Sequence, residues 1–167
     1  MRYPLAILFV ALCVLALGQA ALEMPRLPAL LATHFDAAGE VTGWMSRGYF
    51  FRYQVALTLG FTGFFALIAL LVSILPDHLL NLPHREYWLA PPRRAETRRR
   101  LTNLVLASGC GTLAFFAFLH QRICAANLDG SRRLTPPFGV ILAVAVVLIV
   151  GPVLQPLLQF ARRPPPA

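Results

Sequence analysis

Residues 53–75 read YQVALTLGFTGFFALIALLVSIL and contain no Asp, Glu, Lys or Arg. An α-helix needs about 20 predominantly apolar residues to cross the hydrocarbon core of a bilayer, and this stretch is long enough. Pro76 follows directly and stops the helix, because proline has no N–H to donate to the preceding turn. The stretch therefore predicts a transmembrane helix.

The composition of the whole chain agrees with a membrane location. Of its 167 residues, 57% are hydrophobic and 13% charged, and 15 Arg against 7 acidic residues give a net charge of +8. Soluble domains carry about 25% charged residues, and a soluble chain of this size could not bury so much apolar surface. A disordered chain would show the opposite balance. A nucleic-acid-binding domain would need its Arg residues on a polar face, so we expect no nucleic-acid partner.

The remaining apolar residues gather in three further stretches, at residues 3–22, 101–119 and 138–160. We therefore expect an all-α integral membrane protein with four transmembrane helices. The last stretch contains Gly151-Pro152 and Gln155-Pro156. Because proline breaks the helical hydrogen-bond ladder, we expect a kink or an early end near Gly151.

The first stretch allows a second interpretation, a cleaved signal peptide. Arg2 precedes it, and Gly18-Gln19-Ala20 near its end has the small-x-small pattern of a cleavage site. Its apolar run, however, is longer than the ~7–15 residues usual in signal peptides. We favour an uncleaved helix, with cleavage as the alternative.

The Arg residues in the connections predict the orientation. The N-terminus, the loop at residues 76–100 and the C-terminal tail together hold nine Arg, and the two other loops hold six. By the positive-inside rule, the side with nine Arg is cytoplasmic. We therefore expect both termini in the cytoplasm and the loop at residues 23–52 outside it.

The loop at residues 76–100 is rich in arginine. Pro91-Pro92 can open a helix that carries most of this charge in its first turns and continues into residues 101–119. We expect the basic residues of those turns to contact anionic lipid of the inner leaflet, at about 1 kcal/mol per residue. They are Arg93, Arg94, Arg98, Arg99 and Arg100.

Small residues recur at helical spacing in two of the apolar stretches. Such residues let helix backbones approach closely in a membrane. We expect the two small-residue faces to pack on each other, one made of Ala56, Gly60 and Gly63 and the other of Ala107, Gly111 and Ala114. The four apolar stretches contain no Asp, Glu, Lys or Arg, which disfavours ion-coupled transport, because such transporters usually place an ionisable residue at mid-depth. The sequence does not indicate whether the protein is a monomer or an oligomer.

The loop at residues 23–52 is the most distinctive segment. Asp36 and Gly39 occupy the first and fourth positions of a type I turn. Thr33-His34-Phe35 before the turn and Val41-Thr42 after it have strand-like composition, so we expect a small β-hairpin. Aromatic residues then mark the point where the second helix enters the bilayer: Trp44, Tyr49, Phe50 and Phe51.

This loop also carries a resemblance. The run from Leu27-Pro28 through Thr33-His34-Phe35, Gly39 and Gly43-Trp44 to Ser46-Arg47 resembles the bacterial domain of unknown function 1648 (DUF1648). Residues 81–91, NLPHREYWLAP, are similar to a second stretch found in many of those proteins. Their better-studied relatives are polytopic membrane proteins that give immunity to a secreted sporulation-delaying peptide toxin. The resemblance implies a small bacterial inner-membrane protein.

Three groups of side chains have the chemistry of metal ligands. His34, Asp36 and Glu40 could supply imidazole and carboxylate ligands, but we expect Asp36 to shape the turn instead. His120 and Cys124 lie one helical turn apart, and Asp77 is near two histidines, His78 and His84. We expect both groups to be interfacial polar residues, and we predict neither a metal nor a cofactor.

The loop resemblance favours a non-enzymatic, immunity-like or receptor-like protein that binds a peptide or an envelope protein. We expect Trp44 to be the anchor and Arg47 the charge partner in a binding surface made of His34, Asp36, Gly39, Trp44 and Arg47. Two alternatives are a small transporter or channel component that works as an oligomer, and a structural subunit of a membrane complex.

Overall fold

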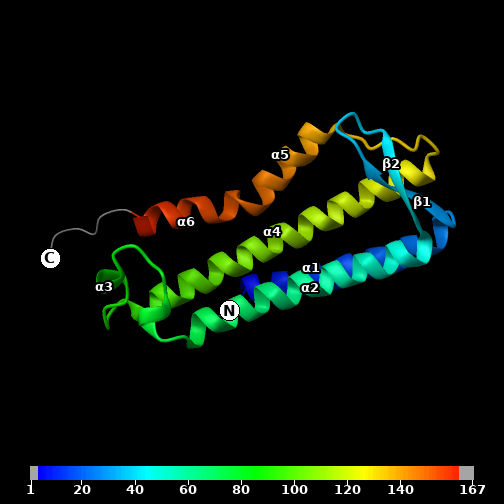
Figure 1. Ribbon diagram of the computed structural model, residues 1–167. Helices are drawn as coiled ribbons and strands as arrows, with labels where there is room; N and C mark the ends of the chain where they lie inside the picture. The colour runs from blue at the N-terminus through cyan, green and yellow to red at the C-terminus, as the bar shows by residue number, and fades with distance from the viewer. Residues whose placement is uncertain (1–3, 162–167) are drawn as a thin grey trace.

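The computed structural model describes residues 4–161, and for residues 155–157 it describes the backbone alone. Long helices lie side by side, a bent pair of helices runs along them, and a two-stranded sheet covers one end (Figure 1). The elements in chain order are α1 (Pro4–Glu23), a 3-10 turn (Met24–Arg26), β1 (Leu30–Phe35), β2 (Val41–Ser46), α2 (Arg47–Ile74), a second 3-10 turn (Asp77–Leu79), α3 (Arg85–Trp88), α4 (Arg94–Leu128), α5 (Phe138–Ile149) and α6 (Gly151–Ala161).

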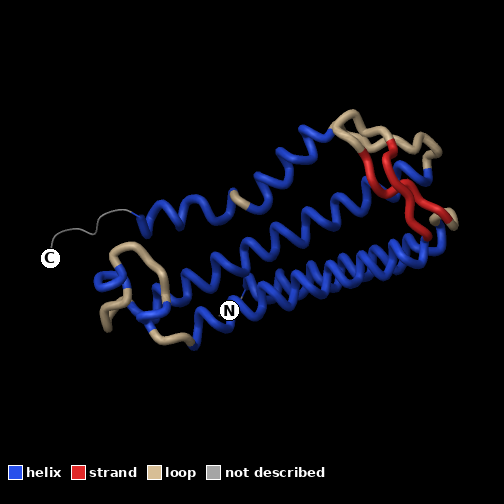
Figure 2. Tube along the Cα trace, in the orientation of Figure 1, coloured by secondary structure: helices blue, strands red, loops and turns tan. Residues whose placement is uncertain are grey.

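The loops and strands gather at the two ends of the bundle (Figure 2). We call the end with β1, β2 and the connection at residues 129–137 the hairpin end. We call the opposite end, residues 75–100, the arginine end. The helix α4 runs between these ends and packs against α1, α2, α5 and α6. It is therefore the central helix of the bundle.

Three helices are long and apolar enough to cross a membrane: Pro4–Arg26, Arg47–Ile74 and Arg94–Leu128. They cover the first three predicted spans except Leu75, which follows α2, and Tyr3, which lies outside the described residues. The helices α2 and α4 are both longer than predicted, and α4 begins just after Pro91-Pro92, as we expected. Three membrane-length helices in the described residues indicate a membrane protein.

The fourth predicted span is not a single helix, so the prediction of four transmembrane helices is not confirmed. Its residues form α5, of 12 residues, and α6, of 11 residues, separated at Val150. At 1.5 Å per residue each is less than about 20 Å long, which is short for a ~30 Å core. The expected break near Gly151 is present.

The break coincides with a close helix contact. Pro152 has no N–H, so it cannot donate to the carbonyl of Leu148 four residues earlier. That carbonyl faces Gly111 of α4, where an added Cβ would collide with it. Glycine at position 111 therefore allows the backbones of α4 and α5 to touch where the helical ladder is interrupted.

The prediction that the two small-residue faces pack on each other is wrong. Ala56, Gly60 and Gly63 lie on the exposed side of α2, and a Cβ added at either glycine would meet no atom within 4 Å. The helices α2 and α4 do pack together, but through larger side chains such as Phe61 and Phe116, whose ring centroids are 5.0 Å apart. On α4, Gly111 packs against α5, while Ala107 and Ala114 are partly buried.

The arginine end is held together by ion pairs rather than left open to lipid. Arg98 has a side chain only 14% exposed, binds Asp77, and donates to the carbonyls of Val72, Ser73 and Leu75. These carbonyls lie at the C-terminus of α2, where helical partners are missing and a cation is favourable. Arg98 is thus a helix cap, and its prediction as a lipid-facing residue is wrong.

The other four arginines of the cluster also have protein partners. Arg94 pairs with Asp77 at 3.0 Å, and the guanidinium carbon of Arg93 lies 3.8 Å from the ring centroid of Tyr87. Glu96 pairs with the two remaining members of the cluster, Arg99 and Arg100. These two and Arg94 stay exposed, so they keep a surface that lipid can reach.

Candidate functional site

The hairpin end is built on a turn whose geometry follows from two residues. The Asp36 carboxylate accepts hydrogen bonds from the backbone N–H groups of Ala38 and Glu40, both at 2.9 Å. Gly39 has a φ of +82°, in the left-handed region that favours glycine. The strands flanking this turn pair antiparallel, with Leu31 opposite Met45. The predicted hairpin and its turn are both present.

The connection at residues 129–137 docks on this turn. The Leu134 N–H donates to the Gly39 carbonyl at 2.9 Å, and Arg133 pairs with Glu40 at 3.0 Å. A Cβ on Gly39 would lie 2.6 Å from the Leu134 carbonyl oxygen, so the docking also requires glycine. Asp36 and Glu40 are thus occupied in the turn, and they do not converge with His34 into a metal site.

The free edge of β1 is covered by one side chain of α4. Asn127 accepts a hydrogen bond from the Ala32 N–H at 2.8 Å and donates to the Ala32 carbonyl at 2.9 Å. The amide side chain therefore makes the backbone hydrogen bonds that a neighbouring strand would otherwise make to this edge. Next to Ala32, Leu31 is fully buried in a cluster with Leu27, Phe50 and Cys124. The hairpin is fixed to the bundle by both its edge and its turn.

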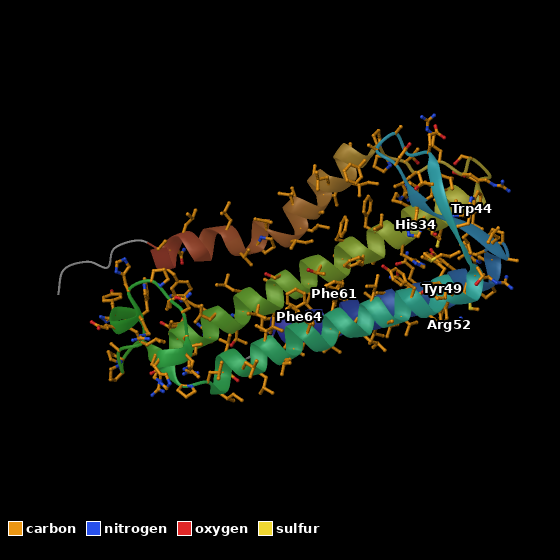
Figure 3. All side chains as sticks on the ribbon, in the orientation of Figure 1. His34, Trp44, Tyr49, Arg52, Phe61 and Phe64 are labelled. Carbon is orange, nitrogen blue, oxygen red and sulfur yellow. The ribbon has the colours of Figure 1, made fainter. Side chains whose placement is uncertain are left out.

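The five residues predicted for binding lie together at this end but do different work. Trp44 is 45% exposed, and the guanidinium carbon of Arg132 lies 5.4 Å from its ring centroid. His34 is exposed as well, and Figure 3 shows it near Trp44 at the hairpin end. Phe61 and Phe64, by contrast, lie further along α2, away from this end. Arg47 donates to the Leu27 carbonyl at 2.9 Å and so positions the chain. Trp44 and His34 are therefore the exposed members whose side chains do not hold the backbone, whereas Asp36, also exposed, Gly39 and Arg47 do.

Beneath the hairpin lies a buried group of ligand-type side chains. The His120 Nε2 lies 3.0 Å from the Glu23 Oε2 and 3.4 Å from the Cys124 Sγ. His120 is 3% exposed, and the ring of Phe50 stacks on it with centroids 5.3 Å apart. In the part of the chain that the structure describes, these three residues are the one group of at least three His, Cys, Asp or Glu whose ligand atoms all lie within 4.8 Å.

The sequence indicated two of these three residues. The spacing of His120 and Cys124 places them on one face of a helix, but their partner Glu23 ends a different helix, α1. A signal was available, because Glu23 is the only acidic residue among the first 35 and directly follows an apolar run. An ionisable residue at such a position is costly and indicates a partner.

A cavity of about 190 Å³ adjoins this group, between α2, α4 and the hairpin. Its lining includes His34, Gln54 and His120 among apolar residues. The His120 Nδ1 and the Gln54 Nε2 are both buried without a hydrogen-bond partner among the described residues. Unpartnered polar atoms beside a cavity of this size fit bound water, each molecule of which needs about 30 Å³.

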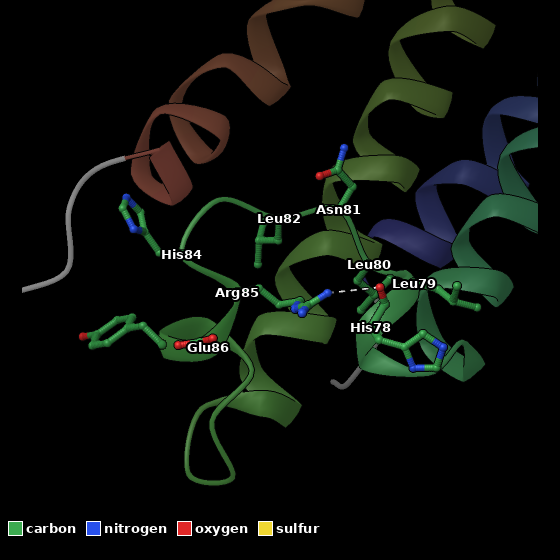
Figure 4. Close-up of a pocket in the computed structure, with 9 residues that line it drawn as sticks. His78, Leu79, Leu80, Asn81, Leu82, His84, Arg85 and Glu86 are labelled. Carbon is green, nitrogen blue, oxygen red and sulfur yellow. Dashed lines mark hydrogen bonds between the residues drawn. The ribbon is translucent and has the colours of Figure 1, made fainter.

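A larger, open cavity of about 700 Å³ lies at the arginine end. A single segment, residues 78–87, lines it, and Arg85 donates to the His78 carbonyl at 3.1 Å across it (Figure 4). This segment overlaps the second stretch of the resemblance. Asp77 is bound to Arg94 and Arg98 instead of to either histidine, so no metal group forms with His78 and His84.

The helices and the hairpin together place the chain in a broad class of proteins, the helical membrane proteins, with a small hairpin at one end of the bundle. The family described as a domain of unknown function (DUF1648) matches residues 11–52, about a quarter of the chain. The match covers α1 from residue 11 onward, the hairpin and the start of α2, and therefore includes Glu23 and the turn residues. Neither a curated protein nor a solved structure gives a significant match.

Proposed function

We propose that the chain is a non-enzymatic inner-membrane protein of a bacterium whose hairpin end binds a peptide or an envelope protein outside the cytoplasm. The observation that carries this proposal is an exposed Trp44 on a hairpin that is fixed to the bundle at its edge and at its turn. Asn127 holds the strand edge, Leu134 holds the turn, and Arg133 pairs with Glu40. Trp and Arg are the residues most often found at the centre of binding surfaces.

Rigidity supports this role because a preorganised surface loses little conformational freedom on binding. Arg132 over the Trp44 ring adds a cation beside the aromatic anchor. A partner with an apolar side chain next to a carboxylate could contact the Trp44 ring with the first and the Arg132 guanidinium with the second. The arginine end carries the larger share of basic residues, which favours the cytoplasmic side for it and the outer side for the hairpin.

The orientation has a direct test. A reporter that is active only outside the cytoplasm should stay inactive when fused after Ala167, and it should become active when inserted between Ala37 and Ala38 at the turn. The opposite pattern would overturn the orientation and, with it, outer recognition.

Binding is tested by survival of a sensitive bacterial host that makes the protein and is exposed to a secreted sporulation-delaying type peptide. We expect the protein to raise the tolerated dose, and Trp44→Ala to lower that dose about tenfold, roughly the value of one hot-spot side chain. Tyr49→Ala, an exposed aromatic change on α2, is the matched control and should keep resistance. Equal membrane abundance of the variants is required. Equal survival with Trp44→Ala and the parent would overturn the proposal, as would ion flux in liposomes with no protection.

A further inference from the structure

The buried group under the hairpin has the donor set of a transition-metal site. We infer that Glu23, His120 and Cys124 bind a Zn²⁺ ion, with water in the fourth position. This inference does not depend on the proposed function, because it concerns residues below the binding surface. Imidazole nitrogen, thiolate sulfur and carboxylate oxygen are the three ligand types of protein zinc sites, and three protein ligands with one open position are a known arrangement.

The spacing of the donor atoms fits such an ion. Tetrahedral Zn²⁺, with bonds of ~2.0–2.2 Å to nitrogen or oxygen and ~2.3 Å to sulfur, sets neighbouring ligand atoms about 3.4–3.6 Å apart. The observed separations are 3.0 Å for His120 Nε2 to Glu23 Oε2 and 3.4 Å for His120 Nε2 to Cys124 Sγ. These two separations are within a few tenths of an ångström of the tetrahedral values, and all three donor atoms lie within 4.8 Å of one another.

Hydrogen bonding alone leaves this group poorly satisfied. The Nε2 of His120 faces both other side chains, and its Nδ1 is buried without a partner among the described residues. If the neutral ring carries its proton on Nε2, Nδ1 is a buried acceptor without a donor. If it carries the proton on Nδ1, the Nε2 lone pair faces the Glu23 carboxylate. A cation at Nε2 removes both problems, because Nδ1 then keeps its proton and donates outward.

The cavity supplies what a metal-bound histidine needs on its far side. Such histidines almost always donate their other N–H to a carbonyl, a carboxylate or a water. His120 and Gln54 both line the cavity, and the His120 Nδ1 and the Gln54 Nε2 are both unpartnered among the described residues, so water in the cavity is the acceptor that the structure offers them. The Phe50 ring stacked on His120 fixes the orientation of the imidazole.

The chemistry of the three ligands also selects the ion. Mg²⁺ and Ca²⁺ prefer all-oxygen sites, whereas a thiolate and an imidazole suit Zn²⁺. Glu23 is 24% exposed on its side chain, so the group reaches the protein surface at this residue. Bound Zn²⁺ would join the end of α1 to α4 next to Leu31, and so anchor the base of the hairpin.

The test is metal binding by the full chain, purified in detergent and stripped with a chelator. We expect one Zn²⁺ per chain after dialysis and, with Co²⁺ as the probe, a thiolate charge-transfer band in the near ultraviolet. Cys124→Ser should abolish this band, and His120→Gln should weaken Zn²⁺ binding at least 100-fold. Cys110→Ser, which changes a buried cysteine elsewhere on α4, is the matched control and should bind like the parent.

Folding and function are separated by two further measurements. Far-ultraviolet circular dichroism must show the same helix content for Cys124→Ser and Cys110→Ser. Glu23→Gln gives a second variant, at the surface edge of the site, and should lower the affinity for Zn²⁺ at least tenfold. Trp44→Ala should bind Zn²⁺ normally, so failure of the recognition proposal leaves this result unaffected. Less than a tenth of an equivalent of Zn²⁺ on the parent, or an unchanged Co²⁺ band in Cys124→Ser, would overturn the inference.

Discussion

The two ends of the bundle differ in the balance of ion pairs and hydrogen bonds that hold them together. At the arginine end, three exposed arginines and the largely buried Arg98 pair with Asp77 and Glu96, and Arg85 donates to the His78 carbonyl within the segment at residues 78–87. At the hairpin end, long-range hydrogen bonds attach the sheet to α4 and to the connection at residues 129–137. Exposed ion pairs are worth little, whereas buried backbone partners are costly to lose. The hairpin end should therefore be the more sensitive of the two.

The largest expected effect is at the turn. Gly39→Ala should destabilise the fold by about 2–4 kcal/mol, because the left-handed conformation costs about 1–2 kcal/mol and the new Cβ would push away the Leu134 carbonyl. Gly130→Ala is the matched control, since Gly130 also has a positive φ but open space around it. Its cost should stay near 1 kcal/mol. Denaturant unfolding in detergent measures both, and equal losses would show that the docking contact contributes nothing.

The edge of the sheet comes next. Asn127→Ala removes the hydrogen bonds to both backbone groups of Ala32 and should cost about 2 kcal/mol. Hydrogen exchange should increase at the Ala32 amide first. The control is Asn103→Ala, an exposed position on the same helix, with a loss under about 0.5 kcal/mol. If Asn103→Ala lowered the free energy of unfolding as much as Asn127→Ala, the loss would come from the helix α4 and not from the bonds to the hairpin.

At the arginine end, Arg98→Ala should cost about 1–2 kcal/mol, because the last carbonyls of α2 lose their donor. Arg99→Ala removes an exposed arginine that pairs with Glu96 and should change stability by less than about 0.5 kcal/mol. Arg98→Lys keeps the charge without the planar fork and should recover part of the loss. A loss for Arg98→Ala above that of Gly39→Ala would reverse the comparison between the ends.

The smallest effect is a pH dependence. The hydrogen bond from Arg98 lowers the pKa of Asp77 below its usual 3.8. A lowered carboxyl pKa stabilises the fold above the unfolded value, and this contribution is lost as the pH falls through the folded value. The melting temperature should therefore fall less for Asp77→Asn than for the parent between about pH 5 and pH 2. Parallel curves would show that Asp77 does not contribute.

Local features of the fold were predictable from the sequence. The turn at Asp36–Gly39, the break near Gly151 and the helix start after Pro91-Pro92 each depend on residues within about four positions. Contacts between helices were not. In a helix that is apolar all round, the residue pattern does not show which face meets a neighbour. Gly60 and Gly111 look equivalent in the sequence, yet one is exposed and the other touches a backbone.

The candidate sites follow the same division. The exposed position of Trp44 was predictable because aromatic residues mark membrane interfaces, while its role in binding stays a prediction. The group of Glu23, His120 and Cys124 was missed because its members come from two helices whose lateral arrangement no local pattern specifies. Arg98 was misjudged for a similar reason, since the carbonyls that it caps belong to the end of another helix.

The hairpin also sets an order of events during synthesis. Ala32 and its partner Asn127 are 95 residues apart in the chain, so the hairpin emerges from the ribosome long before the helix that holds its edge. Contacts of such long range form late and slowly. Until α4 is inserted, β1 has an unpaired edge, which is a site of aggregation. The segment matched by the family at residues 11–52 is thus completed by residues outside it, and grafting it alone into another protein would leave its edge open.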